Sequence, residues 1–221
     1  MENKLFNLDS NKPILTYALT AINVVVAFIG FFAGPEILLE LGAKYNPYIL
    51  QGQFWRFVTP VFLHLNLIHL GVNTYSLLAI GPAVEKFFGK VKFLAIYLIA
   101  GILGNVASFA FSPSISVGAS GAIFGLLGAL FYVGIKYKDI LEQRFMTSIV
   151  VMIAMNLIYG FMHSNIDNFG HIGGLIGGFI SSYSLGLGYS DKLTFKKIVV
   201  FCILLILVIG GILFGFLNPQ T

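Results

Sequence analysis

Ser120 is the residue at which this sequence could carry out chemistry. It stands between Gly118 and Gly121 in the stretch GASGAIFG, and an apolar run extends from it to residue 135. A helix of that length measures about 24 Å, whereas the hydrocarbon core of a bilayer is about 30 Å thick. We therefore expect the helix to begin below the membrane surface with the serine at its start. The hydroxyl could be a nucleophile, or the serine could be a small residue at which membrane helices pack.

His171 is the candidate general base for this serine. Pairs of glycines separated by three residues follow both side chains, and glycines at this spacing let helix backbones approach closely. If the two glycine faces press together, Ser120 and His171 come within hydrogen-bond distance, as a nucleophile and its base require. The glycines are Gly121 and Gly125 after the serine, and Gly173, Gly174, Gly177 and Gly178 after the histidine.

A third member of a catalytic triad is not evident, because no acidic residue falls inside an expected membrane span. Asp167 precedes His171 by four residues and is the only acid that could orient its imidazole. A two-residue Ser–His dyad is the simpler interpretation.

His69 and Asn73 are four residues apart and share one face if their segment is helical. An imidazole beside an amide could donate to a developing oxyanion, or the two could form an interhelical hydrogen-bonded pair with no catalytic role. A metal site is disfavoured, since His64 and His69 diverge on a helix and no acid or cysteine completes a coordination shell. We expect neither a metal nor a cofactor.

The composition is typical of a protein with several membrane spans. Hydrophobic residues make up 57% of the 221 and charged residues only 10%, against about 25% in an average soluble domain. The basic residues are spread over loops and form no nucleic-acid-binding patch, so lipids and membrane proteins are the expected partners. The single cysteine, Cys202, excludes an internal disulfide. The first apolar run lacks a cleavage site after it and predicts a retained helix.

The apolar runs predict an all-α fold, a polytopic membrane helix bundle with a six-helix core and a C-terminal seventh span. We expect a short cytoplasmic N-terminus at residues 1–13, the core at 14–190, and a linker with the seventh span at 191–221. The connection over residues 34–55 is the least apolar part and could lie flat at the membrane interface. The expected spans are residues 14–33, 60–80, 91–111, 120–135, 145–161, 169–188 and 198–217.

The basic residues also predict the orientation in a cell membrane. With the N-terminus in the cytoplasm, every lysine and arginine except Lys44 and Arg56 falls on the cytoplasmic side. Trp55 and Arg56 would then anchor in the outer headgroups, and the C-terminus would lie outside after seven spans. The composition, rich in Lys, Asn, Ile and Phe, suggests a bacterial source.

Five motifs in chain order resemble those of rhomboid intramembrane serine proteases. They are Trp55-Arg56, HLGVN at 69–73, VEKFFG at 84–89, GASG at 118–121 and GHIGG at 170–174. The resemblance covers residues 14–190. Each motif alone is weak, but five in this order on the expected helices are specific.

The resemblance implies that Ser120 is the nucleophile and His171 its general base. It also implies an oxyanion hole made by His69, Asn73 and the backbone N–H of Ser120. Gly118, Gly121 and Gly174 would support this site.

Further parts of the chain resemble structural features of the family. Residues 34–55 resemble its membrane-embedded first loop, residues 163–168 its cap loop, and Glu85 a structural tie in the turn after the second span. Phe124 stands where some members carry a tyrosine that packs against the catalytic histidine. The seventh span resembles the family's 6+1 arrangement.

The predicted function is therefore an endopeptidase that cleaves single-pass membrane proteins near the outer face. An alternative is a non-catalytic rhomboid-like protein that binds membrane clients for quality control, although such proteins usually lack the serine or the histidine. A transporter or proton pathway would show internal repeats or acids within the membrane, and the sequence has neither.

Overall fold

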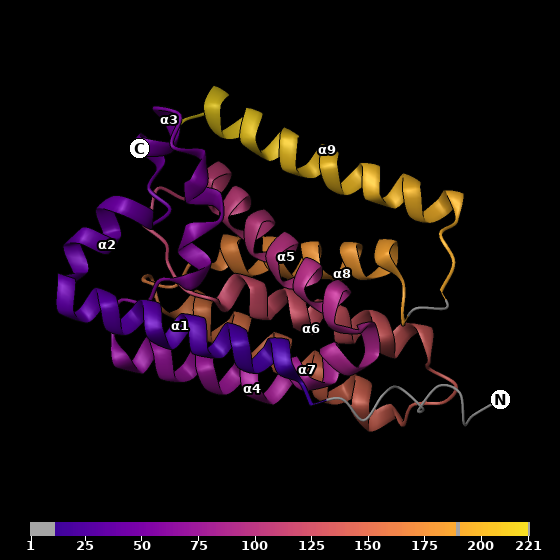
Figure 1. Cartoon of the computed structure of the whole chain (residues 1–221). Helices are drawn as coiled ribbons and strands as arrows, with labels where there is room; N and C mark the ends of the chain where they lie inside the picture. The colour runs from indigo at the N-terminus through magenta and orange to yellow at the C-terminus, as the bar shows by residue number, and fades with distance from the viewer. Residues whose placement is uncertain (1–11, 189–190, 221) are drawn as a thin grey trace.

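The computed structural model describes residues 12–188 and 191–220, and these fold into helices joined by short connections (Figure 1). Apart from an isolated bridge between Lys44 and Ser116, the described residues form no β-structure. The expected all-α fold is confirmed. The α-helices are α1 (Ile14–Ala33), α2 (Pro35–Gly42), α3 (Asn46–Leu50), α4 (Leu67–Phe88), α5 (Lys90–Phe111), α6 (Ser120–Lys136), α7 (Gln143–Met162), α8 (Asn168–Leu185) and α9 (Phe195–Leu217).

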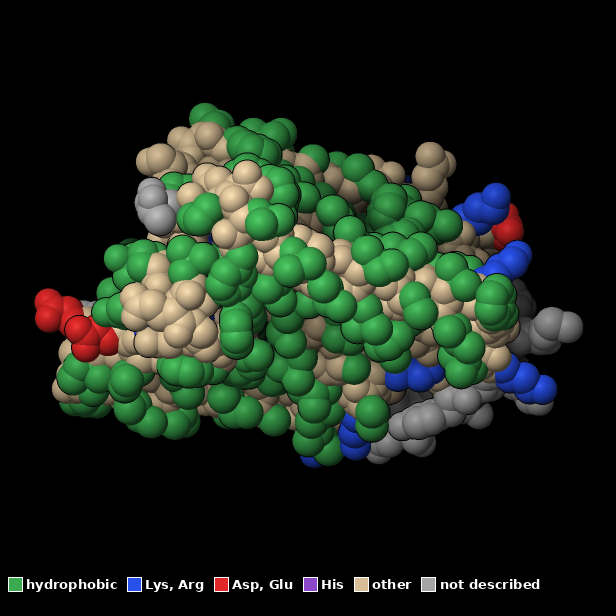
Figure 2. All heavy atoms as spheres, turned by 90° about the horizontal axis from the view of Figure 1, so that it is seen from above, with side chains coloured by type: hydrophobic (Ala, Val, Ile, Leu, Met, Phe, Trp, Pro, Cys, Tyr) green, Lys and Arg blue, Asp and Glu red, His purple; other side chains and the backbone are tan. Residues whose placement is uncertain are grey.

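Five of these helices are long and apolar enough to cross a membrane, namely α1, α4, α5, α7 and α9, and α6 is a shorter apolar helix. Hydrophobic side chains cover the middle of the surface seen in Figure 2, while lysine and arginine side chains gather at one end. This distribution fits a multi-pass membrane protein. The arrangement of six core spans plus one stays a prediction, because α8 is not among the helices that meet these criteria.

The centre of the bundle is formed by α5, α6 and α8, with α8 packed against both of the others. Helices α1 and α4 lie together on one side, and α9 lies on the other side against α5 and α8 (Figure 1). The bundle thereby holds α6 and α8, which carry the serine and the histidine, at its core.

Glycines allow α8 to approach α6 closely. A Cβ atom at Gly174 or Gly178 would collide with the carbonyl oxygens of Gly121 and Gly125 in α6. The expected contact between the two glycine faces is confirmed. The neighbouring face of α8 is packed in the same way, since a Cβ at Gly173 would lie 2.8 Å from the Leu103 carbonyl of α5.

The expected second span was wrong in its boundaries, since α4 begins at Leu67 and not at residue 60. Pro60 lies in a short 3₁₀ segment, Thr59–Phe62, and the side chain of Asn66 accepts a hydrogen bond from the His69 N–H, which caps the helix. The helix then runs through the charged stretch expected to be a turn and ends at Gly89, whose φ of 79° suits glycine.

Glu85 therefore lies inside a helix, in the last turn of α4, and the expectation that no acid lies within a span was also wrong. Its buried carboxylate accepts hydrogen bonds from the Thr16 N–H and hydroxyl, both at 2.8 Å, and from the Leu15 N–H at 3.1 Å. These donors belong to the first turn of α1, where helical N–H groups lack partners. Glu85 ties α4 to α1.

Arg56 does not reach the headgroups, and that expectation was wrong. The residue is 1% exposed and lies in the 3₁₀ segment Phe54–Phe57, within the connection between α1 and α4. The guanidinium donates to the carbonyls of Leu39, Glu40 and Ala43, which end α2. A guanidinium has five donors in a planar fork, so this one side chain can bind three carbonyls and hold the connection against the end of α2. Trp55 is 51% exposed, as an interfacial residue would be.

Candidate active site

Ser120 is the first residue of α6, and the turn before it depends on glycine. Gly118 has φ of 122°, which residues with side chains rarely adopt. Its N–H donates to the Pro60 carbonyl at 2.8 Å, which fixes the turn against the segment before α4. The N–H of Ser120 lies in the first turn of α6, where no helical carbonyl precedes it to accept a hydrogen bond.

The structure brings Ser120 and His171 together. The His171 Nε2 lies 2.9 Å from the Ser120 Oγ, a distance typical of a strong hydrogen bond. The imidazole also stacks on the ring of Phe124, with ring centroids 4.3 Å apart and planes inclined by 14°. The ring is therefore held from two directions, at one nitrogen and on one face.

Asp167 does not hold the imidazole. Its Oδ1 accepts from the Gly170 N–H at 2.9 Å, so the carboxylate caps α8. The backbone carbonyl of Asp167 accepts from the His171 N–H, and the His171 Nδ1 has no hydrogen-bond partner among the described residues. This geometry fits a dyad in which helix capping, and not a hydrogen bond to the ring, positions the histidine.

His69 and Asn73 meet at the turn before the serine. A Cβ atom on Gly118 would lie 2.5 Å from the His69 Nε2 and 3.4 Å from the Asn73 Nδ2, so both side chains border the backbone two residues from Ser120. The Asn73 Nδ2 is buried and has no acceptor among the described residues. A buried donor without an acceptor is uncommon, and this one lies beside the turn that leads into the serine.

A cavity of about 410 Å³ opens at these side chains. Its wall includes Ser120, His171, His69 and Asn73, together with residues of α4, α6 and α7 and the segment at residues 114–117. The volume lies in the usual range for ligand pockets, about 300–1,000 Å³. The candidate residues thus share one cavity that can admit a substrate.

The expected span at residues 60–80 placed His64 on the same helix as His69, and this was wrong because α4 begins at Leu67. His64 lies in the connection before α4, where its buried ring is 5.2 Å from the ring of His69. Within the described ranges, no three metal-binding side chains of His, Cys, Asp or Glu come together. The arrangement offers acid–base and nucleophilic groups.

Comparison with protein families gives a match of residues 51–188 to the Rhomboid domain. The chain belongs to the rhomboid family. The matched residues include both members of the Ser120–His171 pair, the two side chains next to Gly118, and Arg56.

Curated rhomboids resemble this one over much of its length. It is 44% identical over 216 residues to "Rhomboid protease GluP" of Bacillus subtilis, which covers 96% of this chain but only 42% of that protein. It is 33% identical to "Putative rhomboid protease YdcA" of the same species, covering 77% of this chain and 87% of the relative. "Rhomboid-like protease 1" of Toxoplasma gondii is 37% identical, and the match covers 74% of this chain and 56% of that protein. The chain spans less than half the length of GluP.

Sequence reasoning missed two features of this rhomboid's site. The first is the capping role of Asp167, for which an acid three residues before Gly170 was an available signal. The second is Lys44, a buried lysine whose partners lie about 70 residues away in the segment before Ser120. No local pattern marks a contact of that kind.

Proposed function

We propose that this rhomboid is a serine protease that hydrolyses peptide bonds of transmembrane proteins, with Ser120 as nucleophile and His171 as general base. The observation that carries the proposal is the 2.9 Å distance between the His171 Nε2 and the Ser120 Oγ. The names of the three curated relatives described above all contain the word protease and support the same activity.

In the first step, the Ser120 Oγ attacks the carbonyl carbon of the scissile bond while the His171 Nε2 accepts the hydroxyl proton. The imidazolium then donates that proton to the leaving amine, and an acyl-enzyme remains on Ser120. In the second step, water attacks the ester with the imidazole again acting as base. Product acid and free serine result, and no cofactor is needed.

The oxyanion of each tetrahedral intermediate would lie at the start of α6. The Ser120 N–H opens that helix and lacks a helical acceptor, and the Asn73 Nδ2 is buried beside Gly118 without one. His69 borders the same glycine. Preorganised donors of this kind lower the barrier because they need no reorganisation as charge develops.

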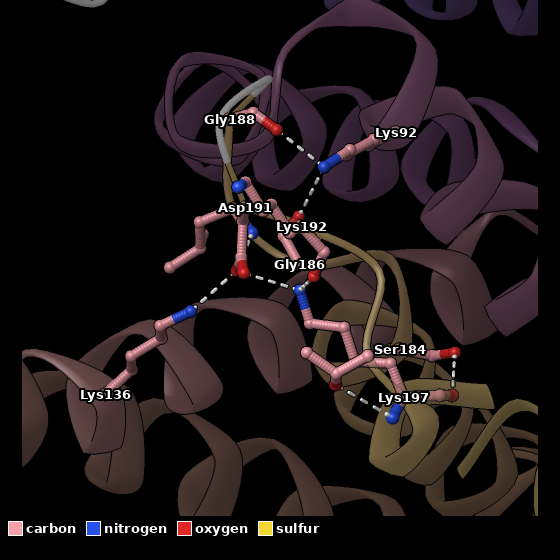
Figure 3. Close-up of polar contacts among 10 residues, drawn as sticks. Lys92, Lys136, Ser184, Gly186, Gly188, Asp191, Lys192 and Lys197 are labelled. Carbon is pink, nitrogen blue, oxygen red and sulfur yellow. Dashed lines mark hydrogen bonds and ion pairs between the residues drawn. The ribbon is translucent and has the colours of Figure 1, made fainter. Parts of the chain in front are cut away.

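The two ends of α6 support cleavage near the outer face of the membrane. Lys136 ends the helix at the basic end of the bundle, where Lys92, Lys192 and Lys197 also lie (Figure 3). Ser120 is at the opposite end, so the positive-inside rule puts it toward the outer face. The cavity wall includes residues of α4 and α7, for example Val72 and Met152, and an entry there would serve substrates that arrive within the bilayer.

The test is cleavage of a single-pass membrane reporter by the purified chain in proteoliposomes. The expected result is cleavage by the wild type and none by Ser120→Ala, with both proteins melting at similar temperatures. Binding of the reporter without cleavage, under conditions in which a fluorophosphonate fails to label Ser120, would favour a non-catalytic client-binding protein and contradict the proposal.

A further inference from the structure

Lys44 is a buried cation in the connection between α2 and α3 that the proposed catalytic steps do not use. The residue is 0% exposed, and its Nζ donates to the backbone carbonyls of Ser112 at 2.8 Å and Ser114 at 2.9 Å. Burial lowers the pKa of the ammonium to about 8, and the negative charge of Asp167 partly offsets that effect. Burying a charge is costly unless hydrogen bonds compensate for it. Here both bonds go to one segment of backbone.

The backbone of Lys44 binds the same segment. Its N–H donates to the Ser116 carbonyl at 2.9 Å, and its carbonyl accepts from the Ser116 N–H at 3.0 Å. The Asn46 Nδ2 adds a third donor to this contact, at 3.0 Å from the Ser112 carbonyl. Three carbonyls at alternate positions, 112, 114 and 116, are therefore held from one side.

This segment leads into the catalytic serine and forms part of the substrate cavity. Residues 114–117 line the cavity of about 410 Å³ together with Ser120 and His171. The turn at Gly118 is held separately, by the Pro60 carbonyl. Loss of the ammonium would leave the Ser114 carbonyl without this donor and loosen the cavity wall there, while the start of α6 and the dyad stay in place.

We propose that Lys44 is a positioning residue for the substrate chain, because its ammonium binds the Ser112 and Ser114 carbonyls and so helps to fix the wall against which the peptide lies beside Ser120. The inference rests on the proposed protease function. In this role Lys44 acts on substrate binding and not on the nucleophile. Its removal should therefore weaken substrate binding and leave the reactivity of Ser120 unchanged.

The variant Lys44→Met keeps the length of the side chain and removes its donors. We expect the KM for a transmembrane substrate to rise about tenfold or more, which corresponds to the loss of charged hydrogen bonds. The rate at which a small fluorophosphonate acylates Ser120 should stay unchanged, because the probe needs the dyad but not the wall. The matched control is Lys138→Met at an exposed lysine in the loop after α6, which should behave like the wild type.

A purely structural role would give a different result. Both substrate cleavage and probe labelling would then fall together with the folded fraction, at a lower Tm, and that result would overturn the inference. An unchanged KM in folded Lys44→Met would also overturn it. Failure of the wild type to label at Ser120 would instead overturn the proposed function, and this inference with it.

The wild type offers a second test that needs no variant. Because the ammonium loses its charge above a pKa of about 8, the KM should rise between about pH 7 and 9.5 as its hydrogen bonds weaken. The charged groups near Lys44 are Asp167, whose negative charge partly offsets the effect of burial, and Arg56, which donates to the Ala43 carbonyl next to it. A flat KM in the wild type, or the same rise in Lys44→Met, would contradict the inference.

Discussion

The ring of Phe124 forms the surface on which the imidazole of His171 rests, with centroids 4.3 Å apart. Phe124 follows Ser120 by one turn of α6, so the helix that carries the hydroxyl also supports the base. The 14° inclination of the two planes leaves the His171 Nε2 free to point at the Ser120 Oγ. The contact needs the aromatic face and no hydroxyl, which fits a phenylalanine where some family members carry tyrosine.

Replacing this ring should loosen the base. In Phe124→Leu we expect kcat to fall about tenfold, since an aromatic pair contributes about 0.5–1.5 kcal/mol beyond its buried area. Phe124→Tyr retains the face and should cleave at close to the wild-type rate. The measurement is kcat per folded molecule for both variants, and a wild-type kcat in Phe124→Leu would show that the stacking does not position His171.

Asn73→Ala tests the oxyanion hole. If the amide stabilises charge that exists only in the transition state, kcat should fall about 10–1,000-fold with little change in KM. A small probe should still acylate Ser120, although slowly, because the dyad is intact. Thermal melting measured beside kcat separates this from a packing role, which predicts a Tm several degrees lower with unchanged kcat per folded molecule.

Gly174→Val tests the contact between α6 and α8. A Cβ at this position would collide with the Gly121 carbonyl, so the helices should move apart and separate His171 from Ser120. We expect loss of cleavage together with a Tm lower by about 5 °C or more, the scale of overpacking. Gly210→Val in α9 is the control, because nothing lies within 4 Å of a Cβ there. Equal behaviour of the two variants would refute the contact.

Asp191→Asn tests how α9 is attached to the core at the basic end. The Asp191 carboxylate binds the Lys136 Nζ of α6 at 2.7 Å and the Lys197 Nζ of α9 at 2.5 Å (Figure 3). Removing its charge should lower Tm by about 2–4 °C, as for a partly exposed ion pair of about 1 kcal/mol. Asp139→Asn, at an exposed acid in the loop after α6, should leave Tm unchanged.

The effect of Asp191 should depend on pH. Burial raises the pKa of this carboxyl, but the hydrogen bonds from Lys136 and Lys197 outweigh it and hold the pKa well below its usual range. The stabilisation is therefore complete above the unfolded pKa of about 3.9 and is lost as the pH falls below it. The Tm difference between wild type and Asp191→Asn should shrink toward pH 3, and a difference that does not change with pH would contradict this.

The sequence predicted those features that depend on local pattern. The apolar run at residues 14–33 has the bounds of α1, and Ser120 begins α6 as expected. The glycine spacing after Ser120 and His171 predicted the helix contact because only residues without side chains permit that approach. These are also the residues that carry the family motifs.

The features that sequence reasoning missed depend on contacts between distant segments. The start of α4 is set by the cap at Asn66. This residue stands between Leu65 and Leu67, so the sequence around it resembles the interior of a span. The distribution of basic residues placed Arg56 and Lys44 on the outer side of the membrane, but it gave no sign that each is buried and donates to backbone carbonyls of another segment. Such partners become visible only when the fold places them side by side.

The central claim is that Ser120 and His171 act as one unit. The most direct measurement is the rate of cleavage of a transmembrane substrate by Ser120→Ala, His171→Ala and the double variant, with fluorophosphonate labelling mapped by mass spectrometry. The account predicts a labelled Ser120 in the wild type, no cleavage by either single variant, and a double variant no worse than either. Substantial cleavage by purified Ser120→Ala, or a fluorophosphonate adduct on a residue other than Ser120, would contradict it.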